Sequence, residues 1–110
     1  PSHCKLMNDA AKKFESLLHE TEFKNTSCQI IHNYNAKTSS DIDNMRTNLV
    51  EQLTNPVQWI KTMNNLKSFE GIIIECGPGK ILKGLGKSND INDIISTSEN
   101  DHVERIKEML

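Results

Sequence analysis

Residues 71–86, which read G-I-I-I-E-C-G-P-G-K-I-L-K-G-L-G, decide the fold class of this chain. The apolar run at residues 72–76 is typical of a strand that is buried on both faces in a parallel sheet. Gly77-Pro78-Gly79 ends that run and predicts a tight turn, after which residues 80–86 predict a short helix. A strand that turns directly into a helix indicates an α/β fold.

The glycine-rich turn also has a second interpretation, as a phosphate-binding loop at the start of a helix. Its glycines lack the spacing of either common nucleotide-binding glycine motif. The tight turn is therefore the favoured interpretation, and the ligand loop is the alternative.

The residues before residue 40 predict a helix, a strand and a loop. Apolar side chains recur at helical spacing over residues 5–20, which predicts the helix. Its expected buried face comprises Leu6, Ala10, Phe14, Leu17 and Leu18. Residues 28–33 have an apolar, β-branched centre between polar ends, which predicts a short strand. The polar residues 33–40 predict a loop.

Two consecutive helices are expected between residue 40 and residue 67. The first begins near Ser40, a residue type that caps helices, and ends before Asn55. Its expected inner face comprises Ile42, Met45, Leu49 and Leu53. Asn55 is then expected to cap a further helix over residues 56–67, with Pro56 as the first helical residue.

Two more elements are expected after the glycine-rich turn. Residues 94–96 predict a last short strand, and Ser98 is expected to cap a final helix that includes Val103, Ile106 and Leu110. The alternation of helices and strands predicts an α/β fold with mostly parallel strands flanked by helices. Two or three strands are few for such a sheet, which favours part of a larger domain.

Charge and composition exclude several classes of function. A net charge of −2 gives no basic surface of the kind that non-specific nucleic-acid binding needs. No apolar run approaches the length of a membrane span, so no membrane partner is expected. Cys4, Cys28 and Cys76 are odd in number and far apart, which suits free thiols in a reducing, cytoplasmic compartment. His19, His32 and His102 have no metal-ligand spacing, so no metal is expected.

Three segments, together with the helix expected from residue 40, carry a resemblance to a known family. They are residues 1–7 (P-S-H-C-K-L-M), 50–59 (V-E-Q-L-T-N-P-V-Q-W) and 75–85 (E-C-G-P-G-K-I-L-K-G-L). Their order and spacing resemble the C-terminal part of the bacterial malonyl-CoA:acyl-carrier-protein transacylases, over nearly the whole chain. Each segment alone is weakly diagnostic, whereas the set is specific.

The resemblance implies that residues 1–110 are the C-terminal portion of the α/β-hydrolase-like large subdomain of an acyltransferase. In that family a serine nucleophile in a G-x-S-x-G elbow and an inserted ferredoxin-like subdomain both lie upstream. No G-x-S-x-G occurs in this sequence. The implied reaction is transfer of malonyl from malonyl-CoA to the thiol of acyl-carrier protein in fatty-acid biosynthesis. The implied enzyme is a cytoplasmic monomer that uses no cofactor.

The resemblance also implies catalytic roles for His3 and Gln52. His3 matches the general base, and imidazole suits that task because it titrates near neutral pH. An exposed loop histidine is the alternative interpretation. The backbone carbonyl of Gln52 matches the group that orients the base. Asn55 either shapes the same loop or caps a helix, and the cap is the favoured interpretation.

Lys80, Lys83 and Lys87 lie on one side of the helix expected after Gly79. They are candidates for docking the acidic carrier protein, and a solvated face is the alternative. Arg46 and Arg105 do not match the arginine that binds the malonyl carboxylate in the family, and both are expected to be solvated.

Two other functions stay open at this point. Because the nucleophile is absent, the chain could be a non-catalytic fragment or a module that only binds carrier protein. The acyltransferase domain of a polyketide synthase is a further alternative, although the P-S-H segment and the compact ending favour the stand-alone enzyme.

Overall fold

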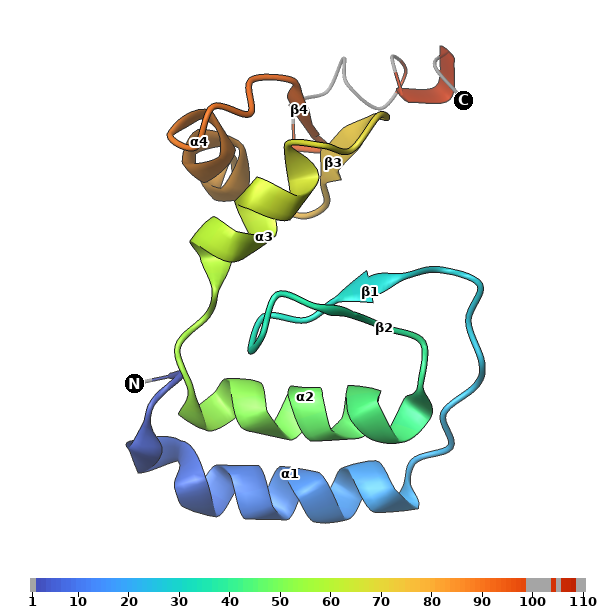
Figure 1. Ribbon diagram of the computed structural model, residues 1–110, viewed down its shortest axis with the longest axis vertical. Helices are drawn as coiled ribbons and strands as arrows, with labels where there is room; N and C mark the ends of the chain where they lie inside the picture. The colour runs from blue at the N-terminus through green and yellow to red at the C-terminus, as the bar shows by residue number, and fades with distance from the viewer. Residues whose placement is uncertain (1, 99–103, 105, 109–110) are drawn as a thin grey trace. The chain divides into compact units, whose positions relative to one another are not determined.

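The computed structural model describes residues 2–98, 104 and 106–108, which fall into two compact units (Figure 1). The first unit extends to Thr62 and the second begins at Met63. The elements of the first unit are the 3₁₀ turn Lys5–Met7, α1 (Asn8–Glu20), β1 (Ile30–Ile31), β2 (Thr38–Ser39) and α2 (Ile42–Thr54). Helix α3 (Trp59–Leu66) crosses the boundary, and β3 (Ile73–Glu75), α4 (Ile81–Lys87) and β4 (Ile94–Ser96) belong to the second unit.

Helices α1 and α2 lie side by side and run in opposite directions in the first unit (Figure 1). Ala11, Leu18 and Met45 are buried there. The face expected for the first helix is therefore partly wrong, because Leu17 is 60% exposed and Leu6 is 81% exposed. Leu17 points about 100° away from Leu18 around the helix, since successive residues turn by that angle. Leu6 lies in the preceding 3₁₀ turn, which winds more tightly than an α-helix.

Helix α2 begins at a different cap from the one expected. Asp41, not Ser40, is the N-cap residue, and its carboxylate accepts the backbone N–H of Asn44 at 2.8 Å. A carboxylate is favoured at this end because the N-terminus of a helix carries the positive end of the helix dipole.

Strands β1 and β2 form a small antiparallel hairpin, with Ile30 opposite Ser39. The strand expected over residues 28–33 is shorter than predicted, and β2 lies within residues 33–40, where a loop was expected. The side chains of β2 are polar and give no apolar alternation from which a strand can be recognised. The expectation of mostly parallel strands is wrong for this sheet.

The second unit contains a strand–helix–strand crossover, β3–α4–β4. The two strands are parallel, with Glu75 opposite Ser96, and α4 supplies the crossover that parallel neighbours require. Gly86 is buried on α4, and a Cβ at this position would overlap the Cδ1 atom of Ile94. The strand, turn and helix expected over residues 71–86, and the strand that follows, are confirmed. The chain thus has an α/β fold with a small parallel sheet.

Helix α3 is shorter than the helix expected over residues 56–67, because it begins at Trp59. Residues 104 and 106–108 are helical, as expected of the final helix. Four positions named above lie outside the described residues: His102, Val103, Arg105 and Leu110. Within the part of the chain that the structure describes, no helix has the length and apolar character needed to cross a membrane.

Candidate functional site

His3 lies at the C-terminal end of α2, where its ring is hydrogen-bonded to the backbone of Gln52. Its Nδ1 is 2.6 Å from the Gln52 carbonyl oxygen, and the residue is half-buried. A carbonyl oxygen only accepts hydrogen bonds, so Nδ1 carries the proton and donates it. In the neutral ring this leaves a lone pair on Nε2, the form in which imidazole takes a proton from a substrate group.

The backbone around His3 is held by the same helix end. The Cys4 N–H donates to the carbonyl of Leu53 at 3.2 Å, one residue further along α2. His3 itself has a φ of 58°, in the left-handed region, which costs a non-glycine residue about 1–3 kcal/mol. Such a conformation persists where its surroundings over-determine it, and the two bonds to α2 act in this way.

The side chain of Gln52 connects this point to the β1–β2 hairpin. Its Oε1 accepts a hydrogen bond from Asn33 Nδ2 at 3.2 Å, and the Asn33 carbonyl accepts the Gln58 N–H at 2.8 Å. One helical turn earlier, the buried Asn48 accepts a bond from Asn35 at 2.9 Å. These asparagines cannot be recognised from the sequence pattern, because a polar residue in a loop or on a helix leaves no periodic signal.

Asn55 closes α2 and does not open the next helix. Its φ of −119° and ψ of 153° make it the C-cap residue of α2. Its Nδ2 donates to the carbonyl and to the carboxylate of Glu51, each at 2.9 Å. The expectation that Asn55 caps a following helix is therefore wrong. Its contacts agree with the other interpretation, in which it shapes the chain beside Gln52.

A second histidine, His32, is buried in the hairpin and is 6% exposed. Its backbone is paired, because its N–H donates to Lys37 at 3.1 Å and its carbonyl accepts the N–H of Ala36 at 2.8 Å. Burial lowers the pKa of its imidazole from the usual 6.5. Its Nε2 is buried and has no hydrogen-bond partner within the described residues. The site therefore favours the neutral ring.

The glycine-rich turn of the second unit is closed by the chain's own groups. Gly77 and Gly79 have φ values of 127° and 93°, which glycine adopts readily. The carboxylate of Glu75 accepts the N–H groups of Leu82 and Lys83, each at 2.9 Å. The carboxylate thus occupies the position that a phosphate would take at the start of α4. The tight-turn interpretation is confirmed, and the phosphate-loop interpretation is not supported.

The three lysines considered for carrier docking lie on α4 or at its start. Lys80 is the N-cap residue and Lys87 the last helical residue, and both are exposed, whereas Lys83 is half-exposed. Three apolar side chains of the same helix are also exposed, namely Ile81 (74%), Leu82 (42%) and Leu85 (41%). Helix α4 therefore exposes basic and apolar side chains together.

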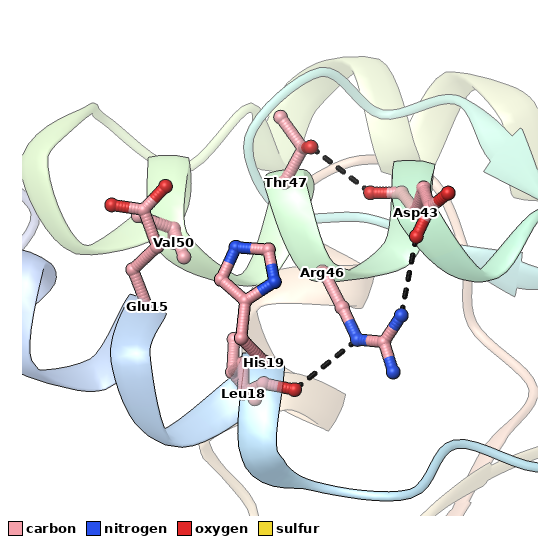
Figure 2. Close-up of a pocket in the computed structure, with 7 residues that line it drawn as sticks. All are labelled: Glu15, Leu18, His19, Asp43, Arg46, Thr47 and Val50. Carbon is pink, nitrogen blue, oxygen red and sulfur yellow. Dashed lines mark hydrogen bonds and ion pairs between the residues drawn. The ribbon is translucent and has the colours of Figure 1, made fainter.

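Figure 2 shows a pocket between α1 and α2, lined by Glu15, Leu18, His19, Asp43, Arg46, Thr47 and Val50. The Arg46 guanidinium donates to the carbonyls of Leu18 at 3.2 Å and Thr21 at 3.1 Å. It pairs with Asp43 at 3.1 Å and lies 4.7 Å from the centroid of the Phe23 ring. The expectation that Arg46 is solvated is wrong, because its side chain is only 23% exposed and caps the end of α1. These contacts make the pocket part of the packing of the two helices.

No protein-family model matches the chain. Among curated proteins, it is 34% identical over 103 residues to the malonyl CoA-acyl carrier protein transacylase of Haemophilus influenzae, which is 92% of this chain and 32% of that protein. Among solved structures, the malonyl-CoA:acyl carrier protein transacylase of Xanthomonas oryzae matches with a TM-score of 0.90 and 32% identity, over 98% of this chain and 35% of that one.

A further solved structure is a malonyl-transacylase in complex with the acyl-carrier protein of a type II polyketide synthase. It matches with a TM-score of 0.82 and 34% identity, over 99% of this chain and 35% of that one. The chain is therefore similar to acyl-transferring enzymes over nearly all of its own length. The particular enzymes are the malonyl CoA-acyl carrier protein transacylases, which confirms the resemblance seen in the sequence. The chain spans about a third of the length of the relatives it matches.

Proposed function

We propose that this chain is the C-terminal portion of a malonyl-CoA:acyl-carrier-protein transacylase and that His3 is the enzyme's general base. It forms part of the α/β-hydrolase-like large subdomain in this proposal. The observation that carries the proposal is the 2.6 Å hydrogen bond from His3 Nδ1 to the Gln52 carbonyl. This bond orients the ring and selects its tautomer, the task that a carboxylate performs in many serine enzymes.

The first half-reaction loads malonyl onto a serine that lies outside these 110 residues. Nε2 of His3 takes the proton of the serine hydroxyl, and the serine oxygen attacks the thioester carbonyl of malonyl-CoA. The C–S bond breaks as the tetrahedral intermediate collapses. The imidazolium gives its proton to the departing CoA thiolate, and malonyl remains as a serine ester.

The second half-reaction uses the same imidazole on the thiol of the carrier protein. Nε2 takes the S–H proton, the thiolate attacks the malonyl ester, and the serine oxygen leaves and regains the proton. The Gln52 carbonyl holds Nδ1–H throughout both halves. The end of α2 stabilises the transient positive charge on the ring. No cofactor enters either half of the proposed reaction.

The direct test is an intact mass spectrum of the purified protein before and after exposure to malonyl-CoA. A species heavier than the 12.5 kDa of these 110 residues that gains one malonyl group supports the transacylase. A species of 12.5 kDa that gains no adduct supports the second candidate function, a non-catalytic fragment or carrier-binding module.

We propose further that α4 is the docking surface for the carrier protein. Lys80, Lys83 and Lys87 supply positive charge that steers an acidic partner, and exposed Ile81 and Leu85 supply apolar contact area. Both candidate functions can use this surface. The mixture of basic and apolar side chains on one helix is the observation that favours docking over a merely solvated face.

Docking is tested by titrating carrier protein into the chain at low and at high salt. Reversing the charge of Lys83 and Lys87 to Glu should weaken binding, and added salt should weaken wild-type binding. The matched control reverses Lys12 and Lys13, which are exposed on α1. An equal loss of affinity for carrier protein in both double variants, or no loss of affinity in either, would argue against α4 as the docking surface.

The location and assembly that we propose are a cytoplasmic monomer, without membrane or nucleic-acid partners. All three cysteines of the sequence, Cys4, Cys28 and Cys76, are free thiols in the structure. Free thiols are the usual state in a reducing compartment.

A further inference from the structure

We propose that Pro56 is a positioning residue for His3, because it withholds the backbone N–H that would otherwise occupy the Gln52 carbonyl. The effect of Pro56 on malonyl transfer rests on the proposed role of His3 as the base. The effect of Pro56 on the hydrogen bond between His3 and Gln52 does not rest on that role, and it can be tested without measuring activity.

In an α-helix, the carbonyl of each residue accepts a hydrogen bond from the N–H four residues later. In α2 this series still holds at Glu51, whose carbonyl accepts the Asn55 N–H at 3.1 Å. The next pair in the series is the Gln52 carbonyl with the N–H of residue 56. Residue 56 is proline, which has no N–H. The Gln52 carbonyl is therefore left for another donor, and His3 Nδ1 is that donor at 2.6 Å.

Pro56 also directs the chain away from the helix. The residue before a proline is disfavoured in the α region, and Asn55 is extended, with a ψ of 153°. The end of α2 therefore stays open, so that the segment with His3 and Cys4 can lie along it. The next carbonyl, that of Leu53, also accepts a hydrogen bond from this segment, from the Cys4 N–H at 3.2 Å.

Pro56 is itself exposed, so its replacement by alanine removes little buried apolar surface. Pro56→Ala restores an N–H at residue 56 and releases Asn55 from the restriction on its ψ angle. The new N–H then competes with His3 for the Gln52 carbonyl, and α2 can lengthen. We expect His3 to lose its partner while the chain remains folded.

The first experiment observes the His3 ring by nitrogen-resolved NMR on the 110-residue chain. In the wild type, the two ring nitrogens should show the tautomer with the proton on Nδ1, and a coupling across the hydrogen bond should link Nδ1 to the Gln52 carbonyl carbon. In Pro56→Ala, the coupling should disappear and the proton should move toward Nε2.

The matched control is Pro78→Ala, which alters the other turn proline in the second unit and should leave the His3 signals unchanged. A wild-type ring protonated on Nε2, or one without the coupling, overturns the proposal even if Pro56→Ala fails to fold. So does a folded Pro56→Ala chain whose His3 signals match the wild type.

A second experiment measures malonyl transfer by the longer enzyme. Pro56→Ala should lower kcat by about 10-fold to 100-fold with little change in KM, because it displaces the base and not the substrate. A rise in KM of about 10-fold to 100-fold with an unchanged kcat overturns the positioning role. If the wild-type protein transfers no malonyl, the proposed function fails, while the NMR experiment still decides the claim about Pro56.

Discussion

The carboxylate of Glu75 accepts the backbone N–H of Leu82 at 2.9 Å, across the glycine-rich turn that joins β3 to α4. Its second oxygen accepts the N–H of Lys83 at 2.9 Å, and the residue is 7% exposed. Glu75→Gln would leave one acceptor oxygen for one of these two backbone N–H groups and would place an NH₂ group, which is a donor, against the other. We expect the free energy of unfolding of the chain to fall by about 1–3 kcal/mol. Urea denaturation measures this change.

The control for this variant is Glu70→Gln, which removes the same charge from an exposed position in the same unit. Its unfolding midpoint should stay close to that of the wild type, because exposed substitutions of this kind have small effects. Equal midpoints for the two variants would show that the amides at the start of α4 do not depend on the Glu75 carboxylate.

Gly84 and Gly86 lie on α4 and should respond in opposite directions to alanine. A Cβ at Gly84 would have no atom within 4 Å, so Gly84→Ala should stabilise the chain by about 0.5–1 kcal/mol through helix propensity. A Cβ at Gly86 would overlap the end of the buried Ile94 side chain, so Gly86→Ala should destabilise the chain by about 1–3 kcal/mol. Thermal unfolding followed by circular dichroism compares the two.

A double variant isolates the contact between Gly86 and Ile94. Ile94→Val removes the Cδ1 atom with which the new Cβ collides. Gly86→Ala should therefore cost less free energy in the Ile94→Val background than in the wild type. The same cost in both backgrounds would mean that the collision with Cδ1 is not the cause.

His32 should make the chain less stable in acid. Burial lowers the pKa of its ring in the folded state below the usual 6.5. The unfolded chain therefore binds a proton at a higher pH than the folded chain does. The contribution of His32 to the free energy of unfolding falls as the pH drops below about 6.5. His32→Gln should lose less stability than the wild type between about pH 7.5 and about pH 5.5, measured by urea denaturation at each pH.

His19 provides the control for the pH experiment, because it is exposed on α1. His19→Gln should keep the wild-type dependence of stability on pH. A His32→Gln chain with that same dependence would show that the titration of other groups, and not of His32, destabilises the chain in acid.

The fold is predictable from the sequence wherever an element carries an apolar pattern or a glycine break. The isoleucines of β3 and β4 and the glycine-rich turn between them predict the crossover that the structure shows. The hairpin has no apolar pattern from which its second strand can be predicted, because β2 consists of the polar residues Thr38 and Ser39. The buried face of α1 was partly misassigned because Leu17 and Leu18 are adjacent leucines, and periodicity alone does not decide which of two neighbours faces the core.

The candidate site depends on contacts between residues that are distant in the sequence. His3 and Gln52 were named from the family resemblance, and the structure brings them together across 49 residues. Their catalytic roles stay predictions. The parts that support them were not predicted. Asn33 is a loop residue without a periodic signal. The sequence pattern predicts Pro56 as the first residue of the next helix, whereas in the structure it follows the C-cap of α2.

His3→Asn separates the proposed base from its anchor. The asparagine amide has an N–H donor for the Gln52 carbonyl, and asparagine tolerates the left-handed backbone that residue 3 adopts better than most residues do. It has no group that takes up a proton near neutral pH. We expect malonyl transfer by the longer enzyme to slow by about 100-fold to 10,000-fold. The melting temperature should stay close to that of the wild type.

Cys4→Ser is the matched control for this variant, because it changes the neighbouring side chain and keeps the backbone bond from residue 4 to Leu53. It should retain nearly full transfer, since the proposed mechanism gives the thiol no task. A slow His3→Asn enzyme beside an active Cys4→Ser enzyme, both with wild-type melting temperatures, would assign the lost step to the imidazole. Near-normal transfer by His3→Asn would remove His3 from the mechanism, and the hydrogen bond to Gln52 would then be a purely structural contact.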